Sequence, residues 1–251
     1  MSVTEAVALL LAGVGGGLSG SIAGLASLIT YPAVLAIGLP PVTANVTNSV
    51  ALVFSSIGSV SASRPELRGQ ARRVGPLAVA GMVGGVVGGA ILLLAPAGSF
   101  ERLVPWMIAL ASVVILVRRR LVEVSLADAG HRTGPAVVGA VGVVGVYGGY
   151  FGAGAGVMLL ALLLYATGDT MPRCNAVKNV VLGVTNGVAA LAFAFFGPVR
   201  WAVVAPLGIG SLIGGRLGPV IVRRAPAGAL RVIIAIAGLG LALKLGVDAY
   251  R

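Results

Sequence analysis

A lysine and a few amide and hydroxyl side chains are the residues whose types and positions could bind a ligand. Lys178 and Asn179 follow Pro172 within an apolar segment, and Thr47 and Asn48 follow Pro41 in the same way. Hydrogen-bond donors beside one positive charge suit an anion. Insertion of a lysine at the bilayer centre costs about 2.5–3.5 kcal/mol, which makes Lys178 a functional candidate. At a depth of roughly 9 Å by helix rise its stem also reaches the interface, so both interpretations stay open.

Two glycine-rich joints could supply the backbone part of the same site. One leads into Ala26-Ser27-Leu28 and the other into Gly154-Ala155-Gly156, each at the start of a short apolar segment. A helix that begins inside the membrane offers free N–H groups and the positive end of its dipole to an anion. Glycine would allow the backbone to approach that ligand closely. The alternative is that these glycines only pack helices together.

Polar side chains also recur at helical spacing in two later segments. Asn45, Asn48, Ser55 and Ser59 share one helix face, and Asn175, Asn179 and Asn186 share another, with Lys178 beside them. Such stripes can line a solute path, or they can simply join helices through hydrogen bonds.

The sets of residues that catalysis, metal binding or ATP hydrolysis would need are absent from the predicted apolar segments. All seven acidic residues fall in predicted loops or at the chain ends: Glu5, Glu66, Glu101, Glu123, Asp128, Asp169 and Asp248. His131 is the only histidine and Cys174 the only cysteine, and no Walker motif is present. We therefore expect no enzyme activity, no cofactor, no bound metal and no ATP hydrolysis by this chain.

The composition places these residues in a membrane. Mean hydropathy is +1.05, 58% of residues are hydrophobic and only 10% are charged, against about a quarter in soluble domains. The positive-inside rule explains the net charge of +11 better than nucleic-acid binding does, because the basic residues gather in a few short loops.

Ten apolar segments position the candidates, and two of the ten are too short to cross a bilayer. Leu25–Gly38 and Gly154–Thr167 would reach only about 21 Å as helices. The ten are Val3–Ile22, Leu25–Gly38, Val42–Ala62, Gly75–Ala95, Leu103–Val117, Pro135–Phe151, Gly154–Thr167, Pro172–Phe195, Trp201–Val222 and Leu230–Val247.

The short segments occupy matching places in two halves, which predicts a duplication. We expect an all-α integral membrane protein with two five-segment repeats, at residues 1–117 and 135–251, joined by a linker at 118–134. Superposed, Thr47 meets Lys178, Asn48 meets Asn179 and Ser55 meets Asn186. An odd number of segments makes the second repeat inverted, and each short segment is expected to form a re-entrant or broken helix.

The basic residues set the orientation. If the segments alternate sides, one side receives Arg64, Arg68, Arg72, Arg73, Arg118, Arg119, Arg120, Arg132, Arg173, Arg223, Arg224 and Arg231. The other side receives Arg102, Arg200, Lys244 and Arg251. The first side should be cytoplasmic, together with the linker, and both termini should lie outside the cell membrane.

The motifs resemble those of the TauE/SafE family of sulfite exporters. The resemblance rests on the paired glycine joints, the Gly38-Leu39-Pro40-Pro41 turn, Thr47-Asn48-Ser49, and the glycines at 152, 154 and 156. It extends over both halves, although Gly24-Leu25-Ala26-Ser27 replaces a run of consecutive glycines. It implies transport of small sulfur-containing anions such as sulfite, sulfoacetate or other organosulfonates.

The residues and the resemblance together predict an anion transporter that needs no ATP. The anion would bind between the repeats to Ala26, Ser27, Gly154, Ala155 and Gly156 at the two helix starts, and to Thr47, Asn48 and Asn179, with Lys178 as the countercharge. A negative cytoplasm favours export of an anion by about 2.3 kcal/mol per charge per 100 mV. A passive anion channel and a membrane scaffold or accessory subunit remain alternatives.

Overall fold

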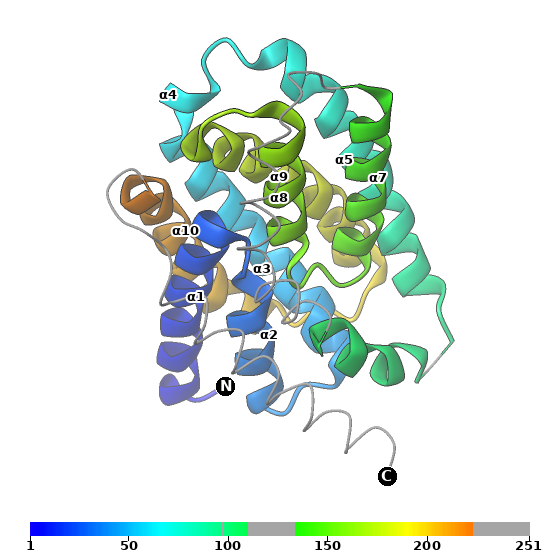
Figure 1. Cartoon of the computed structure of the whole chain (residues 1–251). Coiled ribbons are helices and arrows are strands. Elements are labelled where there is room, and N and C mark those ends of the chain that lie inside the picture. The colour runs from blue at the N-terminus through cyan, green and yellow to red at the C-terminus, as the bar shows by residue number, and fades with distance from the viewer. Residues whose placement is uncertain (97, 110–133, 223–251) are drawn as a thin grey trace.

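The structure is a computed structural model, and it describes residues 1–96, 98–109 and 134–222 (Figure 1). All regular elements in these ranges are helices, which confirms the predicted all-α class for the described residues. The helices are α1 (Val3–Ala23), α2 (Ala26–Ala36), α3 (Pro41–Ala62), α4 (Arg64–Leu67), α5 (Ala71–Leu94), α7 (Pro135–Tyr150), α8 (Ala155–Thr167), α9 (Met171–Phe196) and α10 (Trp201–Val222). Residues 99–109 are also helical.

Local chemistry explains where these helices begin and end. Ser2 and Glu5 form a reciprocal capping box at the start of α1, and Gly24 ends that helix in the left-handed conformation. Pro41 opens α3 and Pro172 lies in the first turn of α9, where a missing N–H costs nothing.

Eight predicted segments lie wholly in the described ranges, and each contains one helix of similar extent. The short helix α4 was not predicted, because its four residues lie in an arginine-rich loop without an apolar pattern. The predicted segment Leu230–Val247, the end of the segment at 103–117 and nearly all of the linker at 118–134 lie outside the described residues.

The first short helix folds back along the helix that precedes it. A Cβ on Gly20 would lie 2.6 Å from the Cβ of Ala26, whereas one on Gly16 would overlap the methyl group of Thr30. The later residue of α1 contacts the earlier residue of α2, and the earlier residue of α1 contacts the later one, so α1 and α2 are antiparallel. The 11 residues of α2 rise about 16 Å, roughly half of the hydrocarbon thickness. The joint therefore forms the tip of a helical hairpin, and the re-entrant or broken helix stays a prediction.

The first helix of each half packs against a late helix of the other half. Gly13 and Gly17 of α1 lie against the backbone around Ser211 of α10, and Gly84 and Gly88 of α5 lie against the backbone around Val146 of α7. Figure 1 shows these two pairs on opposite sides of the molecule, α1 beside α10 and α5 beside α7. In the same view α1 runs upward and α7 downward. This arrangement is compatible with the inverted repeat, which stays a prediction.

The outer surface of the bundle is suited to lipid. Large apolar side chains are exposed on α5, α9 and α10, among them Val83, Leu191, Phe195 and Leu217. Within the described residues, α1, α5, α9 and α10 are long and apolar enough to cross a membrane. These features support a multi-pass membrane protein.

One ion-pair cluster shows which loops share a side. Arg73, at the start of α5, donates to the carboxylate of Asp169 over 2.8 Å, and Arg173 lies 3.6 Å from the same carboxylate. The loop before α5 and the start of α9 therefore lie at the same end of the bundle, as the charge pattern predicts for Arg73 and Arg173.

Candidate functional site

The two glycine joints contact each other, and both of the glycines that touch are buried. Gly24, with φ of +79°, lies so close to Gly156 that a Cβ on either residue would overlap the backbone of the other. Gly24 comes from the first half of the chain and Gly156 from the second. The sequence placed the joints at matching positions but did not predict that they touch.

The second joint needs glycine for its own conformation as well. Gly152 and Gly154 have φ of +77° and +78°, a region that residues with a Cβ rarely adopt. The hydroxyl of Tyr147 in α7 donates to the carbonyl of Ala153 over 2.6 Å and holds the loop between them. The start of α8 is thus fixed against the end of α7.

Both short helices begin without a side-chain cap. Leu25 precedes α2 and Gly154 precedes α8, and neither residue has a side chain that can accept a hydrogen bond from the first turn. Of the first amides, those of Leu28, Ala155, Val157 and Met158 already donate to nearby carbonyls. The amides of Ala26, Ser27 and Gly156 make no such bond among the described residues, so they remain available to a ligand. The dipoles of the two helices add a partial positive charge at the same place.

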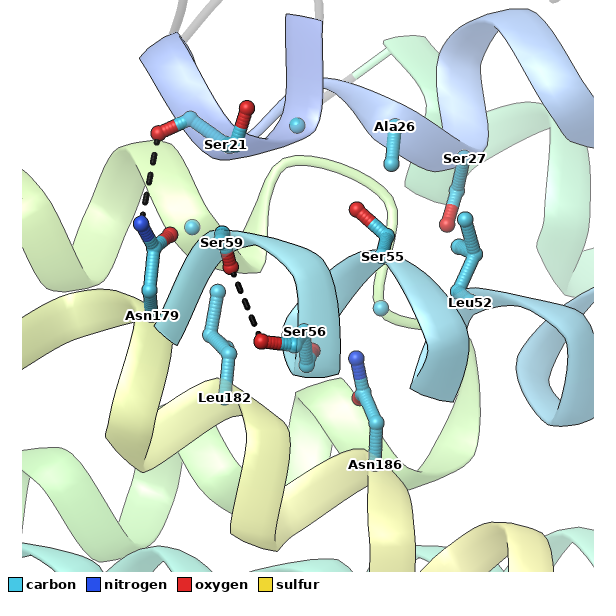
Figure 2. A pocket seen from close by; sticks show the side chains of 14 residues that line it. Ser21, Ala26, Ser27, Leu52, Ser55, Ser56, Ser59, Asn179, Leu182 and Asn186 are labelled. Atoms are coloured by element: carbon cyan, nitrogen blue, oxygen red, sulfur yellow. Dashed lines mark hydrogen bonds between the residues drawn. The ribbon is translucent and has the colours of Figure 1, made fainter. Parts of the chain in front are cut away.

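A pocket of about 50 Å³ opens beside the joints. Figure 2 shows Asn179 and Asn186 reaching from α9 toward the serines of α3, with Ser21, Ala26 and Ser27 around the first joint on the opposite side. The lining consists of Gly20, Ser21, Gly24, Ala26, Ser27, Leu52, Ser55, Ser56, Ser59, Gly152, Gly156, Asn179, Leu182 and Asn186. Residues of both halves therefore enclose one space.

The pocket lining is polar but carries no ionisable side chain. Its polar side chains are five serines and two asparagines, all of which can donate a hydrogen bond. A single buried water needs roughly 10–15 Å³ of such a cavity volume, so the pocket has room for about three to five waters or one small anion. The chemistry available is reversible binding through neutral donors.

Lys178 lies behind the pocket. Its side chain is fully buried, and its ammonium donates to the carbonyls of Gly20 over 2.9 Å and Ser21 over 3.3 Å. Both acceptors belong to the last turn of α1, where the helix dipole favours a cation. Lys178 is therefore directed into the protein and not toward its outer surface. Because Gly20 and Ser21 line the pocket, the charge is one residue removed from it.

Asparagines tie each half to the other. Asn175 donates to the carbonyl of Ser21 over 2.8 Å, and Asn45 donates to the carbonyl of Tyr150 over 2.9 Å. Each is the fifth residue of its helix and bonds near the end of the glycine-rich helix of the opposite half. Counted in this register, Asn48 corresponds to Lys178, one residue away from the superposition that the sequence suggested.

The structure gathers part of the predicted site around the pocket. Ala26, Ser27, Gly156 and Asn179 line it, whereas Thr47, Asn48, Gly154, Ala155 and Lys178 stand outside the lining. Asn48 donates to the hydroxyl of Ser27 over 3.4 Å, so it contacts a lining residue. Thr47 is further removed, since its hydroxyl accepts from the amide of Arg200 over 3.1 Å.

Several lining residues were not among the predicted ligands. Ser55, Ser59 and Asn186 belong to the polar stripes seen in the sequence, and their helical spacing was the available signal. Ser56 lies just off that stripe. Gly20 and Ser21 contribute through the backbone at the end of α1, for which side-chain type gives little signal.

Comparison with known proteins finds one family and several relatives. The model of the family described as "Sulfite exporter TauE/SafE" matches residues 9–245. A probable membrane transporter protein, ORF9, from a Sinorhizobium species is 27% identical over 232 residues, which cover 91% of this chain and 87% of the relative. A probable membrane transporter protein of Haemophilus influenzae is 25% identical, with 91% and 89% covered. The probable membrane transporter protein YfcA of Escherichia coli K12 is 26% identical, with 92% and 85% covered. No solved structure matches the chain.

Proposed function

Because this chain belongs to the TauE/SafE family of membrane transporters, we propose that it exports a small sulfur-containing anion through the pocket between its glycine joints. The observation that carries the proposal is the meeting of Gly24 and Gly156, which brings the uncapped starts of α2 and α8 to one polar space.

The anion is held by hydrogen bonds and by a nearby charge. The hydroxyl of Ser27 and the amides of Asn179 and Asn186 donate to its oxygens, together with backbone amides at the start of α2. The ammonium of Lys178 adds a positive potential through Gly20 and Ser21 without direct contact. Asn48 supports Ser27 from the outside of the pocket.

The size of the pocket favours a compact substrate. Room for about three to five waters suits an anion such as sulfite. A sulfonate with a bulky organic group would require the two halves to move apart. We therefore expect sulfite to bind more tightly than aromatic sulfonates.

Export needs no ATP in this mechanism. A membrane potential that is negative inside lowers the free energy of an anion that leaves by about 2.3 kcal/mol per charge per 100 mV. The acidic residues within the described part of the chain, Glu5, Glu66, Glu101 and Asp169, all lie near helix ends. The described pocket thus has no carboxylate that would relay a proton.

The decisive experiment is anion flux in liposomes that contain the purified protein. We expect labelled sulfite to cross with saturable kinetics, and external unlabelled sulfite to drive counterflow. Flux that does not saturate and shows no counterflow would instead indicate a channel. Absence of flux for every sulfur anion tested would support a scaffold and refute transport.

Substitutions in the pocket test its location. Ser27→Ala and Asn186→Ala each remove one donor to a charged ligand, which is worth about 1.5–3 kcal/mol, so we expect apparent affinity to fall roughly ten- to a hundredfold. Ser61→Ala is the matched control, because Ser61 lies on α3 outside the lining and bonds only to its own helix, at Gly58. Equal flux in all three variants would move the site elsewhere.

A further inference from the structure

The ends of the two glycine-rich helices, α1 and α7, receive different side-chain donors from the opposite half. Asn45 and Asn175 make matching hydrogen bonds of 2.9 and 2.8 Å to the ends of α7 and α1. Three residues later, on the same face of the helix, α9 carries Lys178 and α3 carries Asn48. The end of α1 thus receives an ammonium from the opposite half, whereas the end of α7 receives the neutral amide of Asn45, and the residue that matches Lys178 is the neutral Asn48.

The first half has no counterpart of the Lys178 ammonium, and two of its side-chain oxygens lack a hydrogen-bond partner among the described residues. The side-chain oxygens of Asn45 and Asn48 are buried, and neither has a hydrogen-bond partner among the described residues. The amide of Asn45 is oriented by its donation to Tyr150, so its free atom is an acceptor. In the second half Asn175 also has a free oxygen, but there Lys178 already supplies the charge.

We propose that a monovalent cation of the sodium type binds beside Asn45 and Asn48 at the carboxyl end of α7. Buried acceptors need a donor or a cation, and the end of a helix dipole favours positive charge. Half-helix ends of this kind coordinate sodium in transporters with broken helices. All the oxygens offered are neutral, whereas divalent cations are usually held by carboxylates, so a single charge fits better.

The cation would stand next to the substrate pocket. Asn48 contacts the hydroxyl of Ser27, which lines the pocket on the side away from Asn179. An anion in the pocket would then lie between the ammonium of Lys178 and the bound cation. The binding of the cation itself does not rest on the proposed function, because it follows from the oxygens of this site alone.

The test is the thermal stability of the purified protein in detergent, without any sulfur anion. Sodium, lithium, potassium and choline chloride are compared at equal ionic strength. We expect sodium to raise the midpoint of unfolding by about a few degrees in a saturable way, and choline to leave it unchanged. Equal midpoints in all four salts would overturn the proposal, since water alone would then satisfy the oxygens.

Two substitutions make the test more specific, because each gives one half the residue that the other half has at the matching position. Asn48→Lys supplies a tethered ammonium and should abolish the response to sodium. Lys178→Asn recreates the first-half arrangement at the end of α1 and should enlarge the response. Ser211→Ala is the control, because Ser211 also has a buried unpartnered oxygen but lies on α10, and its response should equal that of the unchanged protein.

Each outcome bears on the site. If Asn48→Lys does not fold, the salt series of the unchanged protein and the Lys178→Asn variant still decide the question. An unchanged sodium response in Asn48→Lys would place the cation elsewhere and refute the proposal. Sodium binding without sulfite flux would support this inference and refute the proposed function. Sulfite flux without sodium binding would support the proposed function and refute this inference.

Discussion

At the scale of single residues, Lys178 explains how a charge can be kept inside the membrane. Its ammonium lies at the end of α1, where the carbonyls of the last turn and the negative end of the helix dipole face it. The carbonyl of Ser21 also accepts from Asn175 over 2.8 Å and from Asn179 over 3.5 Å. The last turn of α1 is therefore attached to α9 by three side chains.

Removal of the ammonium should weaken this attachment. Lys178→Met keeps an unbranched apolar stem but removes the hydrogen bonds of the ammonium to the Gly20 and Ser21 carbonyls, and a hydrogen bond from a charged group is worth about 1.5–3 kcal/mol. We expect a lower midpoint of thermal unfolding in detergent. Arg216→Met is the control, since Arg216 is an exposed cation in α10. Equal midpoints for the two variants would show that the Lys178 bonds add nothing.

Sequence alone identified the residues whose side chains are unusual in a membrane and the two glycine-rich helix starts, and missed the carbonyls at the end of α1. Lys178 and Asn179 were predicted because polar groups stand out in apolar segments, and Ser27 because it lies at the start of a short helix. Gly20 and Ser21 were not, because every residue carries a carbonyl and only the fold decides which carbonyl faces a cation.

At the scale of elements, the contact between the two joints depends on residues without a Cβ. Gly24 and Gly156 approach so closely that a methyl group on either would overlap the other backbone. The approach brings the starts of α2 and α8 to the same pocket. The geometry of the site thus depends on the absence of two side chains.

Three alanine substitutions separate contact from backbone strain. Gly38→Ala introduces only the strain of a positive φ, about 1–2 kcal/mol, because nothing lies within 4 Å of its added Cβ. Gly24→Ala adds overpacking, typically 1–3 kcal/mol more, and Gly156→Ala has the overpacking without the positive φ. We expect Gly24→Ala to be the least stable in thermal unfolding and to lose sulfite flux.

Gly38→Ala should retain flux, as its position is remote from the pocket. If Gly24→Ala and Gly38→Ala unfold at the same temperature and both transport sulfite, the contact between the joints is not required.

The extents of the helices were predictable, but their partners were not. Apolar length, glycine and proline mark where α1, α2 and α9 begin and end. The pairing of α1 with α10 depends on stripes of glycine, and similar stripes occur on α5 and α7. Only the three-dimensional arrangement chooses among such interchangeable surfaces.

At the scale of the whole molecule, an ion pair joins the two halves at one end of the bundle. Burial alone would raise the pKa of Asp169. Hydrogen bonds from the amide of Thr170 and from Gln70 and Arg73, with the charge of Arg73, instead lower it below its ordinary value of 3.8. The carboxylate therefore stays charged, and the halves stay joined, at neutral pH.

The stability that Asp169 contributes should depend on pH in one direction. A lowered pKa in the folded state means that the contribution is complete above the ordinary carboxyl pKa and is lost as pH falls through the lowered value. We expect Asp169→Asn to unfold at a lower temperature than the unchanged protein between pH 5 and 8, and the gap to narrow as the pH falls below about 3.8. A gap that persists in acid would assign the effect to packing.

The glycine contact between α1 and α10 also sets the order of events during synthesis. Ser211 leaves the ribosome nearly two hundred residues after Gly13, which at about 5–20 residues per second is roughly 10–40 s later. Throughout that interval the first helix resides in lipid without its main partner, and its glycine face must be covered by acyl chains or by the insertion machinery. A nascent chain stalled before α10 should consequently expose that face to cross-linkers and to membrane proteases, and the full-length chain should not.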